Sequence, residues 1–173
     1  MLTDTDGKVT IVATTLAALD AEEAGGEATA HFLNVNPPPS WPPQHNDADT
    51  REWMLNLLRQ HPDEPGYNSW YLIADGELVG TLGYTGPPDD EGAVEIGYAV
   101  VDERHRRGYA SAGVALLVSR AFADPRVNLV AAHALADGFA SQGVLLKAGF
   151  TQVGDPVHTD EGPVVRFERK RGT

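Results

Sequence analysis

Residues 95–110, EIGYAVVDERHRRGYA, join an apolar strand to a helix through a short basic turn. The apolar residues of Ala93–Val101 predict a strand. The following segment, Tyr109–Phe122, is apolar almost all round, which is typical of a helix buried against a sheet. A strand that leads directly into such a helix indicates a crossover to another strand of the same sheet.

The basic turn between the two elements has the properties of an anion site. The first amides of a helix lack partners within it and lie at its positive end. Gly108 lets a phosphate approach the backbone closely, and Arg104, Arg106 and Arg107 add positive charge. The pattern alone is equally compatible with an ordinary turn in a solvated basic loop. No P-loop, Rossmann or nucleophile-elbow pattern offers another phosphate site.

The rest of the chain predicts a single α+β domain with a mixed sheet of six to seven strands, flanked by about four helices. Asp75-Gly76 predicts a tight hairpin, and the prolines between Phe32 and Gln44 predict irregular chain. The predicted strands are Val9–Ala13, Ser69–Ala74, Leu78–Thr85, Ala93–Val101, Val127–Leu135, Phe150–Val153 and Val164–Glu168. The predicted helices are Leu16–Ala30, Asp47–Gln60, Tyr109–Phe122 and Phe139–Lys147.

Composition limits the classes of function. The 173 residues include no cysteine, which excludes disulfides, a cysteine nucleophile and thiolate metal sites. A formal net charge of −12 argues against a nucleic-acid partner. The histidines His31, His45, His61 and His158 show no metal-ligand spacing, so no metal is expected. No secretory signal pattern or membrane-spanning apolar run is present, and we therefore expect a cytoplasmic protein without a membrane partner.

Two motifs carry a resemblance to a known family. His105, Gly108 and Ala110 occupy the marked places of Q/R-x-x-G-x-G/A, the acetyl-CoA signature of the GNAT superfamily, with His105 departing from the usual Gln or Arg. Ser141–Phe150 resembles the S-x-x-x-L-x-K-x-G-F helix of the ribosomal-protein N-terminal acetyltransferase (RimJ/RimL-like) branch. The resemblance covers about Ser69 to Glu168 well and the N-terminal third only in outline.

This resemblance implies one GNAT domain over residues 1–173, with an acetyl-CoA-binding core at 93–150 and an acceptor-side segment at 31–67. In the family, the donor's pantetheine arm lies between two splayed strands, here Val94–Val101 and Val127–Leu135. The residues expected to bind acetyl-CoA are Val100, Val101, His105, Arg106, Arg107, Gly108, Tyr109, Ala110 and Ser111.

Acetyl transfer to an amine needs a group that accepts the amine's proton and a group that protonates the departing thiolate. Glu95 is the candidate base because apolar surroundings on a strand would raise the pKa of its carboxyl. Its alternative is a structural ion pair with an arginine across the sheet. Ser141 is the candidate acid, and its alternative is a hydroxyl bonded to the backbone of the first helical turn. His133 is a second candidate base, although a lone strand histidine is more often structural.

Several positions depart from the family pattern or have two interpretations. Leu145 stands where many relatives have a tyrosine acid, and Gly138 where most have an asparagine that touches pantetheine. Trp41, inside the proline-rich segment, is a candidate lid over the acceptor. The interpretation preferred for the other large aromatics is ordinary core; these are Trp53, Trp70 and Tyr84.

The resemblance implies an N-acetyltransferase that moves an acetyl group from acetyl-CoA to a primary amine by direct attack in a ternary complex. The acceptor is a protein N-terminus or a small-molecule amine. The alternative is a non-catalytic acyl-CoA-binding sensor of the same fold, which the departures at Gly138 and Leu145 favour. A homodimer is common in such folds, and nothing in the sequence decides it.

Overall fold

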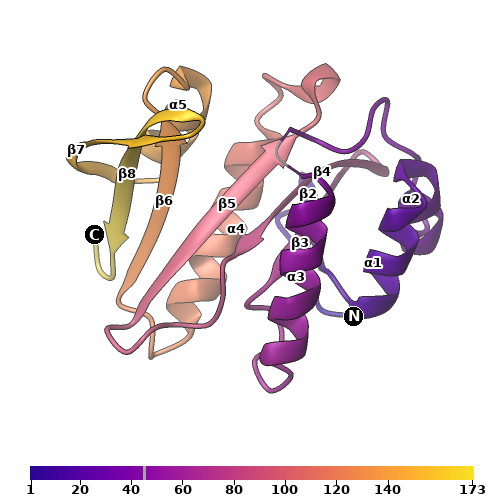
Figure 1. Ribbon diagram of the computed structural model, residues 1–173, viewed down its shortest axis with the longest axis horizontal. Coiled ribbons are helices and arrows are strands. Elements are labelled where there is room, and N and C mark those ends of the chain that lie inside the picture. Colours follow the sequence, from indigo (N-terminus) through magenta and orange to yellow (C-terminus); the bar gives the residue numbers. More distant parts are fainter. Residues whose placement is uncertain (45) are drawn as a thin grey trace.

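The computed structural model describes residues 1–44 and 46–173, and within them one mixed sheet carries helices on both faces (Figure 1). The strands are β1 (Thr3–Thr5), β2 (Val9–Ala13), β3 (Ser69–Ala74), β4 (Glu77–Tyr84), β5 (Ala93–Val100), β6 (Leu129–Leu135), β7 (Thr151–Thr159) and β8 (Gly162–Lys170). The helices are α1 (Leu16–Glu23), α2 (Gly26–Leu33), α3 (Ala48–Gln60), α4 (Tyr109–Ala123) and α5 (Phe139–Lys147), with a 3₁₀ turn at Asp102–Arg104.

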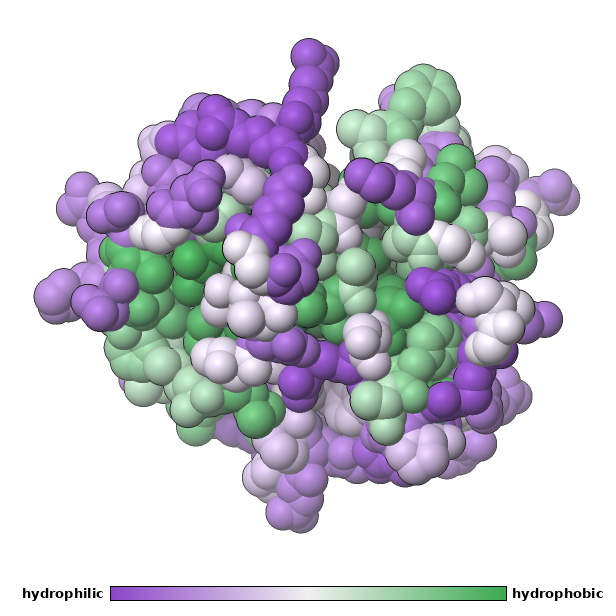
Figure 2. Space-filling model, turned by 180° about the vertical axis from the view of Figure 1, so that it is seen from behind, coloured by the Kyte–Doolittle hydropathy of each residue, from purple (hydrophilic) through white to green (hydrophobic). Residues whose placement is uncertain are grey.

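The strand order is β1-β2-β3-β4-β5-β6-β8-β7, and every neighbouring pair is antiparallel except β5 and β6. A parallel pair needs a crossover, and α4 provides it by passing behind β5, whereas α3 lies in front of the sheet (Figure 1). The buried face of α4 includes Val114, Leu117 and Ala121, which pack with Val94, Ile96 and their neighbours in the main core. From the α4 side, hydrophilic residues surround patches of apolar surface (Figure 2).

Pairing between β5 and β6 covers only half of β5. Ala93–Ile96 pairs with Leu129–Ala132, and the two strands separate beyond these residues. Glu95 accepts a backbone hydrogen bond from Thr85, directly after β4, and Val101 donates one to Val79 on β4. Because these bonds alternate along an antiparallel strand, the backbone groups of Tyr98 and Val100 face the gap toward β6. The splay expected from the family resemblance is therefore present.

The sheet is larger than the sequence predicted. The prediction of six to seven strands missed β1, a polar three-residue edge strand that pairs with β2 and is too short to show alternation. The predicted helix Leu16–Ala30 is two helices, α1 and α2, which Gly25 separates with a φ of 112°. The described residues therefore form eight strands and five α-helices.

The large aromatic residues only partly follow the environments expected for them. Trp70 and Tyr84 are buried in the core, as predicted. Trp41 does not line the acceptor side, because it packs against the cluster that Tyr71 and Leu78 form under α2, so the lid hypothesis is wrong. Trp53 is 45% exposed rather than buried, so its assignment to the core is also wrong.

No helix among residues 1–44 and 46–173 combines the length and the apolar character that a bilayer crossing requires. The described residues also contain no group of three or more His, Asp or Glu side chains placed to hold a metal ion, and His45 lies outside them.

Replacing Leu145 by alanine should lower the free energy of unfolding by about 3 kcal/mol, because the side chain is fully buried in the core and its loss leaves a cavity. Its neighbour Leu146 is 58% exposed, and Leu146→Ala should change stability by less than about 0.5 kcal/mol. Urea unfolding of both variants makes the comparison. Equal losses would mean that α5 does not pack on the sheet through Leu145.

Candidate active site

The turn before α4 presents a row of unpartnered backbone amides. Arg106 (φ 63°) and Gly108 (φ 76°) both adopt left-handed conformations, a backbone shape that forms anion-binding concavities. The amides of Arg106–Ser111, called here the amide row, make no hydrogen bond to any described part of the chain. Six consecutive free N–H groups at a helix N-terminus form a site for a phosphate or pyrophosphate.

The cationic side chains around the amide row differ in whether they are free to bind an anion. Arg106 and Arg107 are exposed and pair with no acidic residue of the described chain. Arg104 is not available, because its guanidinium lies 2.7 Å from Glu77, which corrects its predicted contribution. Lys8, in the turn before β2, brings its ammonium to 2.8 Å from where a Cβ on Gly108 would lie.

The remaining residues expected at the donor site have other local roles. Val100 and Val101 bury their side chains, so only their backbone groups can face a donor. His105 directs Nε2 to the carbonyl oxygen of Val100, 2.6 Å away. Tyr109 is buried and donates its hydroxyl to Asp75. Ala110 and Ser111 are partly exposed at the start of α4.

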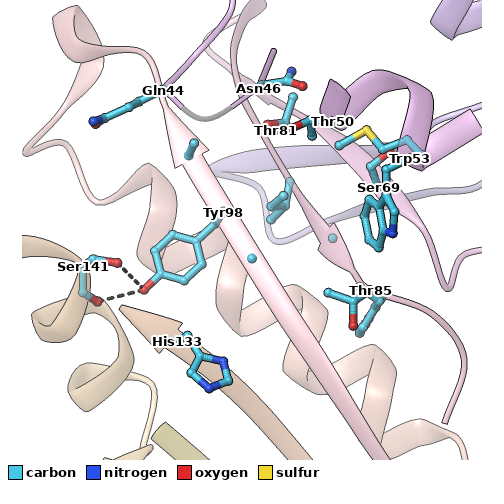
Figure 3. Close-up of a pocket in the computed structure, with 16 residues that line it drawn as sticks. Gln44, Asn46, Thr50, Trp53, Ser69, Thr81, Thr85, Tyr98, His133 and Ser141 are labelled. Carbon is cyan, nitrogen blue, oxygen red and sulfur yellow. Dashed lines mark hydrogen bonds between the residues drawn. The ribbon is translucent and has the colours of Figure 1, made fainter. Parts of the chain in front are cut away.

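A cavity of about 290 Å³ opens above β4 and β5, between α3 on one side and β6 with α5 on the other (Figure 3). Residues from all of these elements form its wall. They are Gln44, Asn46, Thr50, Trp53, Met54, Ser69, Thr81, Leu82, Gly83, Tyr84, Thr85, Gly97, Tyr98, Ala99, His133 and Ser141. The cavity therefore adjoins the gap between β5 and β6, and it contains the two candidates His133 and Ser141.

The side chains of Glu95 on β5 and His133 on β6 are in contact where the pairing of the two strands ends. The carboxylate Oε1 lies in short contact with His133 Nδ1, and the two side chains are 38% and 39% exposed. The alternative of an arginine partner is not observed, because Arg166, opposite His133 on β8, pairs with Glu168. The Glu95 side chain is partly exposed and contacts His133, so it does not lie in wholly apolar surroundings. His133, rather than Glu95, lines the cavity.

Ser141 and Tyr98 form a second pair at the same end of the cavity (Figure 3). The Ser141 hydroxyl donates to the Tyr98 oxygen at 3.0 Å, and the Tyr98 hydroxyl donates to the Ser141 carbonyl at 2.8 Å. Burial raises the pKa of Tyr98 to about 12, so its hydroxyl stays protonated near neutral pH. The Ser141 hydroxyl is thus fixed by a tyrosine from β5 and not by its own helix.

Both departures from the family pattern have a structural consequence. Leu145 is fully buried in the core and does not line the cavity. Gly138 is the N-cap of α5 and offers no side-chain hydrogen bond. Gln142 instead fastens α5 to the end of β6, since its amide donates to the carbonyls of Leu135 and Ala136.

Sequence reasoning missed three contributors to the site. Tyr98 belongs to no motif that marks it as functional, yet its hydroxyl reaches Ser141 on α5. Lys8 precedes Gly108 by a hundred residues and gives no local signal. Trp53 follows an apolar helical stripe, and the exposure that places it in the cavity wall is a tertiary property.

Comparisons with known proteins identify a family and several similar chains. A family described as "Acetyltransferase (GNAT) domain" matches residues 14–151. The chain is 33% identical over 100 residues to Uncharacterized N-acetyltransferase YjdG of Bacillus subtilis, and 35% identical over 78 residues to Uncharacterized N-acetyltransferase YoaA of the same organism. These matches cover 57% and 45% of this chain but only 60% and 44% of the two relatives.

A similar solved structure is RimL, a ribosomal L7/L12 alpha-N-protein acetyltransferase in complex with coenzyme A. It superposes with a TM-score of 0.72 over 96% of each chain at 18% identity. At this identity the likeness shows the fold.

A double-mutant cycle tests the hydroxyl pair. Tyr98→Phe and Ser141→Ala should each lower the free energy of unfolding by about 1 kcal/mol, because each removes a hydroxyl that the other residue uses. The double variant should lose clearly less than the sum of the two single losses. Additive losses in urea unfolding would show that the two side chains do not interact in solution.

Proposed function

The chain belongs to the GNAT acetyltransferase family, and on that premise we propose that it transfers an acetyl group from acetyl-CoA to a primary amine. The acceptor amine, on a protein N-terminus or a small molecule, attacks the thioester directly in a ternary complex. The described chain offers no cysteine for an acyl-enzyme route.

The observation that carries this proposal is the amide row beside the splayed strands. The pyrophosphate of acetyl-CoA would accept hydrogen bonds from the row, with Arg106, Arg107 and Lys8 adding positive charge. The pantetheine arm would then enter the gap and hydrogen-bond the free backbone groups of Tyr98 and the N–H of Val100, since the Val100 carbonyl already pairs with His105. This path brings the thioester to the part of the cavity that His133 and Ser141 line.

His133 is the proposed general base, and Glu95 is its positioning residue. The carboxylate fixes the proton on Nδ1 and thereby leaves Nε2 as the acceptor, an arrangement that also stabilises the imidazolium once it forms. An amine that has lost its proton to Nε2 attacks the thioester carbonyl. Backbone N–H groups of β5 that face the gap stabilise the developing oxyanion.

Ser141 is the proposed acid for the departing thiolate. When the C–S bond breaks, the sulfur takes the hydroxyl proton of Ser141, and the serine oxygen takes in its place the extra proton on the nitrogen of the tetrahedral intermediate. The Tyr98 side chain holds that hydroxyl in place and, because it stays protonated, adds no negative charge near the leaving thiolate. The alternative function, a non-catalytic acyl-CoA sensor, rests on the missing family side chains at Gly138 and Leu145.

The test of the proposed function is calorimetric titration with acetyl-CoA and CoA, followed by thiol release with panels of amines and peptides. Binding together with acceptor-dependent thiol release supports the enzyme. Tight binding without release under any acceptor supports the sensor. An absence of binding overturns both.

Replacing Gly108 by valine should weaken acetyl-CoA binding at least tenfold, because the side chain meets the Lys8 ammonium and covers the amide row. The positive φ should also cost on the order of 1–2 kcal/mol of stability. Gly154 on β7 has a similar φ of 72° with open space around it, so Gly154→Val is the matched control and should keep full affinity. Equal affinities in calorimetry would remove the amide row from the donor site.

Replacing His133 by alanine should lower kcat by roughly 10²- to 10⁴-fold without changing acetyl-CoA affinity. Glu95→Gln should lower kcat less, about tenfold, because the base remains and only its orientation is lost. The exposed His158 on β7 provides the control variant His158→Ala, with an unchanged rate. A larger loss in Glu95→Gln than in His133→Ala would return the role of base to Glu95.

A further inference from the structure

A second cavity, of about 270 Å³, lies between the end of α4 and the segment of chain that precedes β3. Its wall includes Gly66, Tyr67, Tyr84, Arg120 and Asp124. Arg120 is in the last turns of α4, whereas the amide row surrounds the first turn, so about 16 Å of helix separates the two. This cavity is therefore distinct from the proposed acetyl-CoA site.

The guanidinium of Arg120 has no hydrogen-bond acceptor within the described chain. It lies over the ring of Trp70, with 4.7 Å between Cζ and the ring centroid, and this cation–π contact restrains the side chain. Its ion-pair partner is Asp4 on β1, but Nη1 and the carboxylate oxygen are 3.7 Å apart, which is too far for a hydrogen bond. A guanidinium carries five N–H donors, so Arg120 is a positioned cation whose donors are unused.

A ligand in the cavity can reach this guanidinium. The Arg120 side chain is 32% exposed and forms part of the cavity wall. Its Nη2 lies 3.5 Å from where a Cβ on Gly66, another wall residue, would lie. The charged end of the side chain, and not only its aliphatic stem, is therefore at the wall. Arginine stays protonated in proteins, and its planar fork matches the two oxygens of a carboxylate.

The other charges near the cavity favour a ligand with a single negative charge. Asp124 in the wall accepts hydrogen bonds from Arg126 and Tyr67, which hold the pKa of its carboxyl far below the usual range. This fixed negative charge, together with that of Asp4, disfavours a dianion such as phosphate. A carboxylate needs only the one free guanidinium that the cavity offers.

The remaining wall favours an aromatic ring beside the carboxylate. Tyr67 and Tyr84 are in edge-to-face contact, with ring centroids 5.2 Å apart. Their hydroxyls are already used, because Tyr67 donates to Asp124 and Tyr84 to the carbonyl of Leu117. The two residues therefore offer a ligand their rings, against which another aromatic ring packs well. Drug-sized ligands occupy pockets of about 300 Å³ or more, so this cavity suits a smaller molecule.

We propose that this cavity binds a small aromatic carboxylate, with the carboxylate on Arg120 and the ring against Tyr67 and Tyr84. The site does not depend on the proposed function, since neither acetyl-CoA nor an acceptor amine takes part in it. Tyr84 also lines the cavity of the candidate active site, so the test must distinguish the two cavities.

The indole N–H of Trp70 provides a local signal for the experiment. It donates to the carbonyl of Gly66 at 2.8 Å, directly in the wall, whereas Trp53 lines the other cavity and Trp41 lines neither. The ¹⁵N-labelled full chain is titrated with benzoate, and the three indole signals are assigned with Trp41→Phe and Trp53→Phe. The Trp70 signal should shift while the other two stay in place.

Two further ligands test the chemistry of the site. Benzamide has the shape of benzoate without its charge, and it should bind at least tenfold more weakly, because a hydrogen-bonded ion pair becomes a neutral contact. Inorganic phosphate lacks the ring and carries more charge, and it should also bind at least tenfold more weakly.

Three variants locate the carboxylate. Arg120→Met keeps an apolar side chain over Trp70 and removes the charge, so it should weaken benzoate binding at least tenfold and abolish the difference from benzamide. Asp4→Asn removes the competing carboxylate and should tighten benzoate binding about threefold. The control is Arg59→Met, which removes an exposed arginine of α3 and should leave the affinity unchanged.

An unmoved Trp70 signal at tens of millimolar benzoate would overturn the site, as would an affinity that survives Arg120→Met. A shift of Trp53 without one of Trp70 would place benzoate in the other cavity and overturn the proposal as well. Equal affinities for benzoate and benzamide would remove the role of the carboxylate, and equal affinities for benzoate and phosphate would remove the preference for an aromatic monoanion. Each of these results leaves acetyl-CoA binding and the proposed function untouched.

Discussion

Backbone pairing between β5 and β6 ends at Ile96 and Ala132, and the position of every other part of the site depends on where it ends. Where the pairing ends, the two strands bring Glu95 and His133 into contact. Beyond it, the separation exposes backbone groups of Tyr98 and Val100. The crossover helix α4 begins at the wide end of the gap, which places the amide row where a ligand lying in the gap would end.

The two halves of the sheet contribute different things to this site. Strands β1–β5 with α1–α3 form the side on which the buried Glu22 and Asn46 lie, whereas β6–β8 with α5 supply His133 and Ser141. Tyr98 connects the halves across the gap, because its ring starts on β5 and its hydroxyl bonds to α5. The wall of the cavity on the α3 side and the proposed reacting groups therefore come from different halves of the sheet.

Much of the fold was readable from local patterns. The strand at Val9–Ala13 and the helix at Phe139–Lys147 have the predicted bounds, and the GNAT resemblance is confirmed by the family match. The errors arise where contacts between distant parts of the chain decide the environment of a side chain. Arg104 has the sequence context of a phosphate ligand, yet Glu77 from the neighbouring strand pairs with it. Trp41, expected over the acceptor, packs against a core cluster, and Trp53, expected in the core, lies in the cavity wall. Apolar character alone does not show which face of a segment another element covers.

An incompletely paired strand inside a sheet is also an edge, and exposed edges promote association between chains. Most proteins protect edges with charged residues, prolines or bulges. In this protein the free edge of β5 is enclosed, since β6 and β8 continue the sheet on the other side of the gap. A strand from another molecule would have to thread between them lengthwise. The fold can thus leave backbone groups of β5 unpaired without the aggregation hazard that such an edge would carry at the rim of the sheet.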